Sequence, residues 1–132
     1  MENIEINEYV RTKNGVIAQF THIETYYKDK IYWFDNTIYQ DYEENISYLR
    51  DNNLEKYIKK HTFNLIDLIE EGDYVNGELV VDKLQTPCRI GKQGKKFIFT
   101  KKMNIGEGYF EEDIKSIVTK QVFESMEYKV GE

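Results

Sequence analysis

The residue types that most often perform catalysis or bind metals are sparse in this sequence. Its two histidines, His22 and His61, are far apart, and neither stands at a zinc-site spacing from Cys88, the single cysteine. The chain lacks the G-x-S-x-G, G-x-x-x-x-G-K-[ST] and H-E-x-x-H motifs of hydrolases, nucleotide-binding proteins and metalloproteases. We therefore expect no catalytic residues, no metal and no cofactor, and we expect the protein not to be an enzyme.

Residues 106–113 combine two glycines with four acidic side chains. Calcium takes six to eight oxygen ligands, so such a segment could in principle bind it. The spacing of an EF-hand is missing, and we expect an acidic loop facing solvent.

Residues 35–55 form a more informative segment, in which six acids face one base, Arg50. Three tyrosines lie among these acids, and interleaved carboxylates and aromatic rings can imitate the charges and bases of a nucleic acid. Acidic segments also keep proteins soluble, and that alternative stays open. The predicted partner-binding residues are Asp35, Tyr39, Asp41, Tyr42, Glu43, Glu44, Tyr48, Asp51 and Glu55.

An opposite, basic block contains Arg89, Lys92, Lys95, Lys96, Lys101 and Lys102, with no acid between residues 87 and 106. Its strand at residues 96–100 alternates, so Phe97 and Phe99 share one face while Lys96 and Ile98 share the other. We expect the two phenylalanines to lie in the core rather than to stack on nucleic-acid bases.

The elements that must position these segments are mostly strands. An Asn14-Gly15 turn joins residues 8–13 to 16–20, and Asn76-Gly77 repeats the pattern within residues 72–81, so both predict hairpins with two-residue type I′ turns. Further strands are expected at residues 23–27, 31–34, 89–90, 114–118 and 128–130, with 89–90 pairing with 96–100.

Helices are expected to be few and short. Residues 53–60 have apolar side chains at one helical face, Asn64 could cap a single turn, and Thr119 is a good N-cap for a helix through Ser125. The predicted fold class is α+β, mostly antiparallel β, with hairpins forming an SH3-like or partly open small barrel with short helices. We expect one domain over residues 1–132, without two independent cores; subdomains 1–60, with the acidic insert, and 61–132 are its natural division.

Composition limits the binding partners and the cellular compartment that can be expected for this protein. The chain has 132 residues and a net charge of −6, which argues against general affinity for nucleic acid or anionic membranes. A single cysteine, an acidic start and the lack of a long apolar run favour a cytoplasmic protein.

The phrases N-L-I-D-L-I-E-E-G-D-Y-V-N-G at residues 64–77 and D-I-K-S-I-V-T-K at residues 113–120 carry a family resemblance. They resemble small, mostly uncharacterised proteins of phages, prophages and mobile elements of low-GC Gram-positive bacteria, and the likeness extends over residues 7–15, 61–81 and 111–130. It implies an origin in a bacterial host cell and supplies no catalytic residue.

Small acidic phage proteins without active sites are often inhibitors of bacterial defence, anti-CRISPR proteins among them. The leading hypothesis is therefore a non-enzymatic inhibitor that binds a host defence nuclease with a basic groove, through an acidic Tyr-rich surface that mimics nucleic acid. Two alternatives stay open: a small-ligand sponge for a signalling nucleotide, held by the basic hairpin and tyrosines, and an SH3-like protein-interaction module without inhibitory role. Self-association is compatible with the last.

Overall fold

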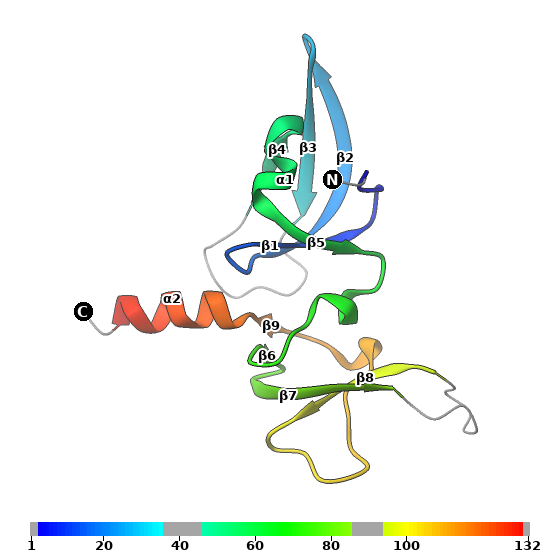
Figure 1. Cartoon of the computed structure of the whole chain (residues 1–132), viewed down its shortest axis with the longest axis vertical. Helices are drawn as coiled ribbons and strands as arrows, with labels where there is room; N and C mark the ends of the chain where they lie inside the picture. Colours follow the sequence, from blue (N-terminus) through cyan, green and yellow to red (C-terminus); the bar gives the residue numbers. More distant parts are fainter. Residues whose placement is uncertain (1–2, 36–45, 86–93, 131–132) are drawn as a thin grey trace.

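The computed structural model describes residues 3–35, 46–85 and 94–130, and these form two antiparallel sheets (Figure 1). The N-terminal sheet has the strand order β4-β3-β2-β1-β5, and the C-terminal sheet has the order β8-β7-β6-β9. The strands are β1 (Tyr9–Thr12), β2 (Ile17–Tyr26), β3 (Asp29–Asp35), β4 (Tyr48–Arg50), β5 (Ile58–Thr62), β6 (Tyr74–Val75), β7 (Glu78–Gln85), β8 (Lys96–Thr100) and β9 (Ile117–Val118).

Within the described residues, helical structure consists of short turns and one longer helix. These elements are the 3₁₀ turns η1 (Asp51–Asn53), η2 (Leu65–Leu68) and η3 (Glu111–Asp113), the single-turn helix α1 (Leu54–Tyr57) and the helix α2 (Lys120–Val130). The prediction of a mostly antiparallel α+β protein is confirmed. The sheets of the described residues do not close into a barrel.

The two Asn-Gly turns differ in type. Asn76 (φ 52°) and Gly77 (φ 79°) are both left-handed between the paired residues Val75 and Glu78, which is the predicted two-residue type I′ turn. In the first hairpin only Gly15 has a positive φ, 91°, and the Thr12 amide donates to the Val16 carbonyl at 2.9 Å. That loop therefore has three residues, and the type I′ prediction is wrong there.

The β2–β3 hairpin is the longest in the chain and projects from the rest of the molecule at the top of Figure 1. Its strands pair from Gln19 with Asp35 to Tyr26 with Asp29, and a bulge at residue 21 shifts the register. Tyr27 occupies the turn with φ 59° and a side chain that is 91% exposed. The hairpin thus ends in an aromatic side chain that no core contact explains.

Two adjoining hydrophobic clusters form the interior of the described residues. The N-terminal cluster contains Phe20, Phe34 and Leu49, and the C-terminal cluster contains residues of η2 together with Val75, Val80, Ile98 and Ile117. The clusters meet in β2, where Ile17 belongs to the C-terminal cluster and its neighbour Ala18 to the N-terminal one. Alternation of side chains along one strand lets β2 serve both.

Several expected elements differ in the structure. The helix expected at residues 53–60 is the single turn α1, because Ile58 begins the edge strand β5 and is buried there. The strand expected at residues 114–118 is confined to β9, and the one at 128–130 is instead the end of α2. Thr119 precedes α2 as expected, and the helix runs beyond Ser125.

Strand β8 pairs with β7, and residues 89–90, its expected partner, lie outside the described residues. The alternation of β8 is as predicted, but the assignment of its faces is wrong. Ile98 and Thr100 are fully buried, whereas Phe97 and Phe99 are half-buried on the other face. Ile98 packs in the C-terminal cluster, and the two phenylalanines line a surface groove of about 400 Å³.

Candidate binding surface

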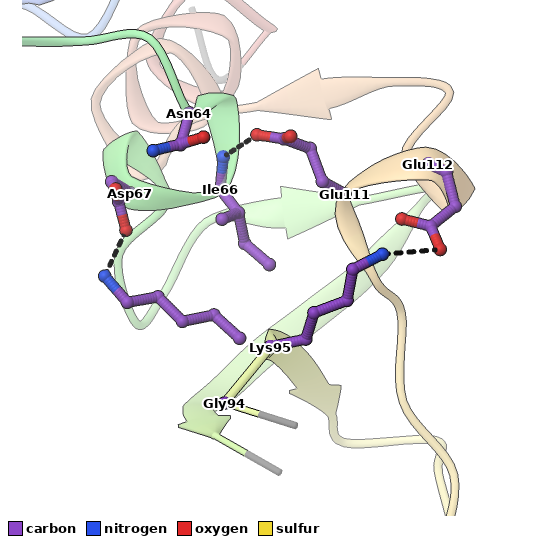
Figure 2. A pocket seen from close by; sticks show the side chains of 8 residues that line it. Asn64, Ile66, Asp67, Gly94, Lys95, Glu111 and Glu112 are labelled. Carbon is purple, nitrogen blue, oxygen red and sulfur yellow. Dashed lines mark hydrogen bonds and ion pairs between the residues drawn. The ribbon is translucent and has the colours of Figure 1, made fainter. Parts of the chain in front are cut away.

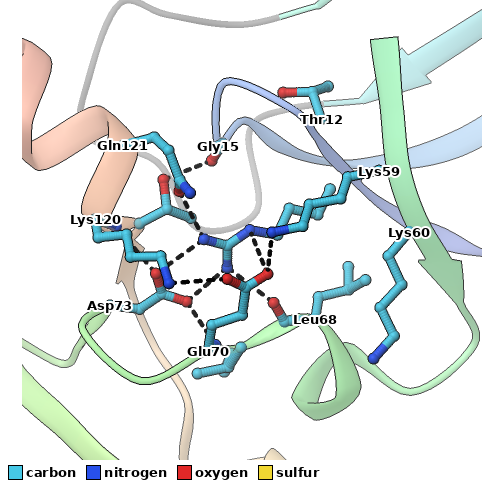
Figure 3. Close-up of polar contacts among 12 residues, drawn as sticks. Thr12, Gly15, Lys59, Lys60, Leu68, Glu70, Asp73, Lys120 and Gln121 are labelled. Atoms are coloured by element: carbon cyan, nitrogen blue, oxygen red, sulfur yellow. Dashed lines mark hydrogen bonds and ion pairs between the residues drawn. The ribbon is translucent and has the colours of Figure 1, made fainter. Parts of the chain in front are cut away.

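A buried ion pair fixes the positions of the two sheets. Arg11 from β1 and Asp73, which precedes β6, are both inaccessible to solvent. The Arg11 Nη1 donates to Asp73 Oδ2 at 2.6 Å and its Nη2 donates to Asp73 Oδ1 at 3.0 Å (Figure 3). Such a two-point contact sets both distance and orientation. The pair therefore holds the N-terminal sheet against the C-terminal sheet.

Further groups form hydrogen bonds with both members of this pair, although the buried Arg11 Nε has no hydrogen-bond partner among the described residues and lies 3.5 Å from Glu70 Oε2. Arg11 Nη1 also donates to the Leu68 carbonyl at 2.9 Å, and Nη2 donates to Gln121 Oε1 at 2.7 Å. The Asp73 carboxylate accepts two backbone N–H groups, from Glu70 at 2.7 Å and from Lys120 at 3.0 Å. A buried pair with this many hydrogen bonds is a structural element, because no lone pair of the carboxylate remains for a reactant.

Glu70 covers the outer side of the same cluster. It lies 3.5 Å from Arg11 Nε, 2.9 Å from Lys59 Nζ and 3.0 Å from Lys120 Nζ. Burial acts to raise the pKa of Glu70, but hydrogen bonds from Lys59 and Lys120 and the charge of Arg11 outweigh it and lower the pKa to about 2. Glu70 is consequently ionised at neutral pH and cannot serve as a proton donor.

Helix α2 is attached to the N-terminal hairpin beside this cluster. Thr119 Oγ1 donates to the Gly15 carbonyl at 2.7 Å and accepts the Val122 amide at 3.4 Å, so the predicted N-cap is confirmed. A β-carbon built on Gly15 would lie 2.3 Å from Thr119 Oγ1, and glycine is required there for space as well as for its φ. The result is a rigid centre from which both sheets extend.

A pocket of about 260 Å³ lies between η2, the start of β8 and η3 (Figure 2). Its charges are paired across the opening: Lys96 lies 2.5 Å from Asp67 Oδ1, and Lys95 lies 3.5 Å from Glu112 Oε1. Glu111 Oε1 accepts the Ile66 amide at 3.1 Å. With each acid engaged, no general base is set beside a nucleophile in this pocket.

A row of aromatic rings, exposed at both ends and half-buried at its centre, crosses the outer face of the N-terminal sheet. The row, which we call the aromatic row, consists of His22 on β2, Trp33 on β3 and Tyr48 on β4. The Trp33 ring is stacked on His22 at 6.0 Å between centroids and lies 5.4 Å from the ring of Tyr48. His22 pairs with Trp33 in register, and Trp33 pairs with Tyr48. The side chain of His22 and the whole of Tyr48 are each 53% exposed.

Alternation explains why these rings face outward. Their neighbours Phe20, Tyr32 and Phe34 point to the other face and are buried in the N-terminal cluster. The core is therefore filled without the aromatic row. His22 and Tyr48 are exposed at the surface, whereas Trp33 between them is half-buried, and its indole Nε1 is buried without a hydrogen-bond partner among the described residues. Solvent-exposed aromatic groups of this kind are enriched where proteins bind other proteins.

The predicted partner-binding residues are placed in part. Tyr39, Asp41, Tyr42, Glu43 and Glu44 lie outside the described residues. Of the others, Tyr48 belongs to the aromatic row and Asp35 ends β3. Asp51 and Glu55 follow β4 in η1 and α1, and Asp51 Oδ1 accepts the Tyr32 hydroxyl at 3.0 Å.

The acids at residues 106–113 bind backbone groups of their own loop or of its neighbours. Glu107 Oε1 accepts the Asn104 amide at 3.2 Å, and Asp113 Oδ2 accepts the Phe110 amide at 3.0 Å. Among the residues that the structure describes, no three acidic, histidine or cysteine side chains are grouped as a metal would require. Cys88 is outside that part of the chain.

Comparison with protein-family models, with curated proteins and with solved structures finds no match for this chain. Within the described residues, no helix combines the length and the apolar character needed to cross a membrane.

Two groups of residues at the surface were not predicted from the sequence. One is the pair His22 and Trp33, although alternation within the strand expected at residues 31–34 already places Trp33 on the face opposite Tyr32 and Phe34. The lysines around η2 come from strands far apart in the sequence, and no local signal brings them together.

Proposed function

We propose that this chain is a non-enzymatic binding protein that docks on a partner protein with a basic, nucleic-acid-binding groove. The docking surface comprises the aromatic row and the acidic connection between β3 and β4. The observation that carries the proposal is that Trp33 and Tyr48 of the aromatic row pair with each other beside both ends of the acidic connection between β3 and β4.

The strand pairing ties that segment to the aromatic row. Residues 36–47 leave β3 after Asp35 and return in β4 at Tyr48, and the Phe34 amide donates to the Ser47 carbonyl at 3.0 Å. Because β3 and β4 are antiparallel neighbours, both ends of the connection lie beside Trp33 and Tyr48. In sequence the connection contains three acids, two tyrosines and no base.

The negative charge of the connection between β3 and β4 favours a partner with a basic surface. The described part of this half carries both signs, with Lys28, Lys30 and Arg50 among its acids, so the excess negative charge comes from the connection. Carboxylates next to flat aromatic rings fit a surface evolved for phosphates and bases. A nuclease with a basic groove is such a partner, and the resemblance to phage proteins supports a bacterial defence nuclease.

Inhibition of cleavage tests this function. RNA-guided nucleases of Gram-positive bacteria would be incubated with increasing amounts of the chain, and DNA cleavage would be followed on gels. We expect inhibition at about one chain per nuclease and its loss in the D41K/E43K/E44K triple variant. Full inhibition by the triple variant would refute nucleic-acid mimicry.

A pair of matched tyrosine variants separates the aromatic row from general surface effects. Tyr48 and Tyr57 are 53% and 42% exposed, and only Tyr48 belongs to the aromatic row. We expect Tyr48→Ala to weaken binding about 10- to 30-fold, as at an interface hot spot, and Tyr57→Ala to leave it unchanged. If both Tyr48→Ala and the D41K/E43K/E44K triple variant still bind as the parent does, the result would favour an interaction module without inhibitory role.

A further inference from the structure

Three lysines from three strands converge on the turn η2. Lys60 comes from β5, Lys83 from β7 and Lys96 from β8, so they join the N-terminal sheet to the C-terminal sheet. Lys60 Nζ donates to the Asp67 carbonyl at 2.7 Å, and Lys96 Nζ donates to the Asp67 carboxylate at 2.5 Å. Lys83 Nζ donates to the Ile69 carbonyl at 3.1 Å. We call these three residues the lysine cluster.

The lysine cluster has an excess of positive charge. Among the described residues, Asp67 is the one carboxylate in hydrogen-bond contact with the cluster. Glu70, another acid near Lys83, is already shared among Arg11, Lys59 and Lys120. Three ammonium groups therefore face one engaged carboxylate.

The pKa of Lys83 also reflects the excess of positive charge in the lysine cluster. Burial lowers the pKa of Lys83, and the charges of Lys60 and Lys96 lower it further, while Asp67 and Glu70 act in the opposite direction. Gathering like charges around a partly buried amine disfavours the charged form. Perturbed groups of this kind cluster at functional sites.

The lysine cluster also has hydrogen-bond donors to offer. An ammonium group has three N–H donors. The hydrogen bonds above use one on each lysine, which leaves donors that can point to a ligand. Of the three lysines, Lys96 lines the pocket of about 260 Å³, so there is space beside its donors (Figure 2). The other polar residues of that lining are Asn64, Asp67, Lys95, Glu111 and Glu112, and both glutamates are engaged by Lys95 or by the Ile66 amide.

We propose that the lysine cluster binds a phosphate group, supplied by inorganic phosphate or by a nucleotide. A phosphate has several acceptor oxygens and a charge that would neutralise the excess at Lys60, Lys83 and Lys96. The site is distinct from the proposed docking surface, because it lies at the junction of the two sheets rather than on the outer face of β2, β3 and β4.

A purely structural role is the competing explanation. Lys60 and Lys83 bind carbonyl groups at the end of η2, which a short turn leaves without backbone partners. The two roles make opposite predictions for a variant without the Lys83 charge. If the lysine only satisfies a carbonyl, its removal destabilises the protein; if it belongs to an anion site, removal relieves repulsion.

Thermal unfolding of the full chain distinguishes these roles. Sodium phosphate, pyrophosphate and ATP would each be compared with sodium chloride at equal ionic strength. We expect the unfolding temperature to rise by about 4 °C at a ligand concentration about ten times the Kd. A rise with phosphate identifies the free anion as sufficient, and a rise with ATP alone identifies a nucleotide. No rise with any of the three would overturn the proposal.

Matched variants locate the effect. Lys83→Met should unfold in chloride at the same temperature as the parent or higher, and should lose the rise caused by phosphate or ATP. Lys96→Met, at an exposed position, should lose the rise as well and serves if Lys83→Met does not fold. Lys28→Met, on the distant β2–β3 turn, should keep it. Loss of the rise in Lys28→Met, or its persistence in both of the other variants, would overturn the site.

Discussion

Replacing Asp73 by asparagine should destabilise the protein more than any surface substitution of the same kind. The Asp73 carboxylate accepts four hydrogen bonds, two of them from the buried guanidinium of Arg11. An asparagine has one oxygen in place of two and presents an NH₂ group to N–H donors. It would also leave the Arg11 charge without its counterion in a site that excludes water.

Breaking one member of a buried ion pair costs about 3–5 kcal/mol. A single domain has a free energy of unfolding of about 5–15 kcal/mol, so a large fraction of its stability would be lost. For a chain of this length the unfolding temperature should fall by roughly 10–20 °C. Urea titration at neutral pH, followed by circular dichroism, measures the free energy directly.

Asp29→Asn is the matched control, because Asp29 is exposed near the β2–β3 turn. Its effect should stay within about 0.5 kcal/mol. The double variant Arg11→Met with Asp73→Leu should recover part of the lost stability, since it removes both buried charges. A loss below about 1 kcal/mol in Asp73→Asn would refute the view that this pair holds the two sheets together.

Three more predictions concern the same framework. Folding lowers the pKa of Glu70 from 4.5 to about 2, so its stabilising charge is fully present above pH 4.5 and is lost as the pH falls toward 2. Glu70→Gln should flatten the decline of unfolding free energy over that range; an unchanged pH profile would contradict the shift. Thr119→Val should lower the free energy of unfolding in urea by about 1–2 kcal/mol, because it removes the N-cap of α2 and the hydrogen bond to Gly15. An unchanged urea midpoint would contradict a stabilising role of this cap. Asn76→Ala should lower the free energy of unfolding by about 2 kcal/mol, because Asn76 has φ 52° and its side chain accepts two backbone N–H groups and donates to a carbonyl. Asn76→Asp keeps the acceptor and should lose less stability. Equal losses in the two variants would contradict a role for this acceptor.

Local sequence signals predicted some elements correctly, although not the turn type of the first hairpin. The Asn76-Gly77 turn, the β-branched and aromatic residues of β3 and the Thr119 cap all act over a few neighbouring residues, and the structure confirms each. Residues 53–60 have a helical pattern, yet pairing of Ile58 with β1 overrides it. Pairing between distant strands cannot be read from such short-range patterns.

The faces of β8 show a second limit of sequence reasoning. Alternation correctly separates Phe97 and Phe99 from Ile98, but size alone does not decide which face is covered. The buried ion pair was missed for a related reason, because Arg11 and Asp73 are 62 residues apart. Only the packing of the two sheets brings them together.

The candidate surfaces were predictable to different degrees. Tyr48 was included among the partner-binding residues from its place in the acidic segment, whereas Trp33 and His22 join it only through strand register. The five predicted residues at positions 39 and 41–44 lie outside the described residues, and their part in binding stays a prediction.

Hydrogen–deuterium exchange of the chain, alone and with an equimolar RNA-guided nuclease that it inhibits, tests the docking surface most directly. The account predicts slower exchange in β3, β4 and the connection between them, and no change in β7 and β8 of the C-terminal sheet. Protection confined to the C-terminal sheet, with β3 and β4 unchanged, would contradict the proposal that the aromatic row and the acidic connection form the binding surface.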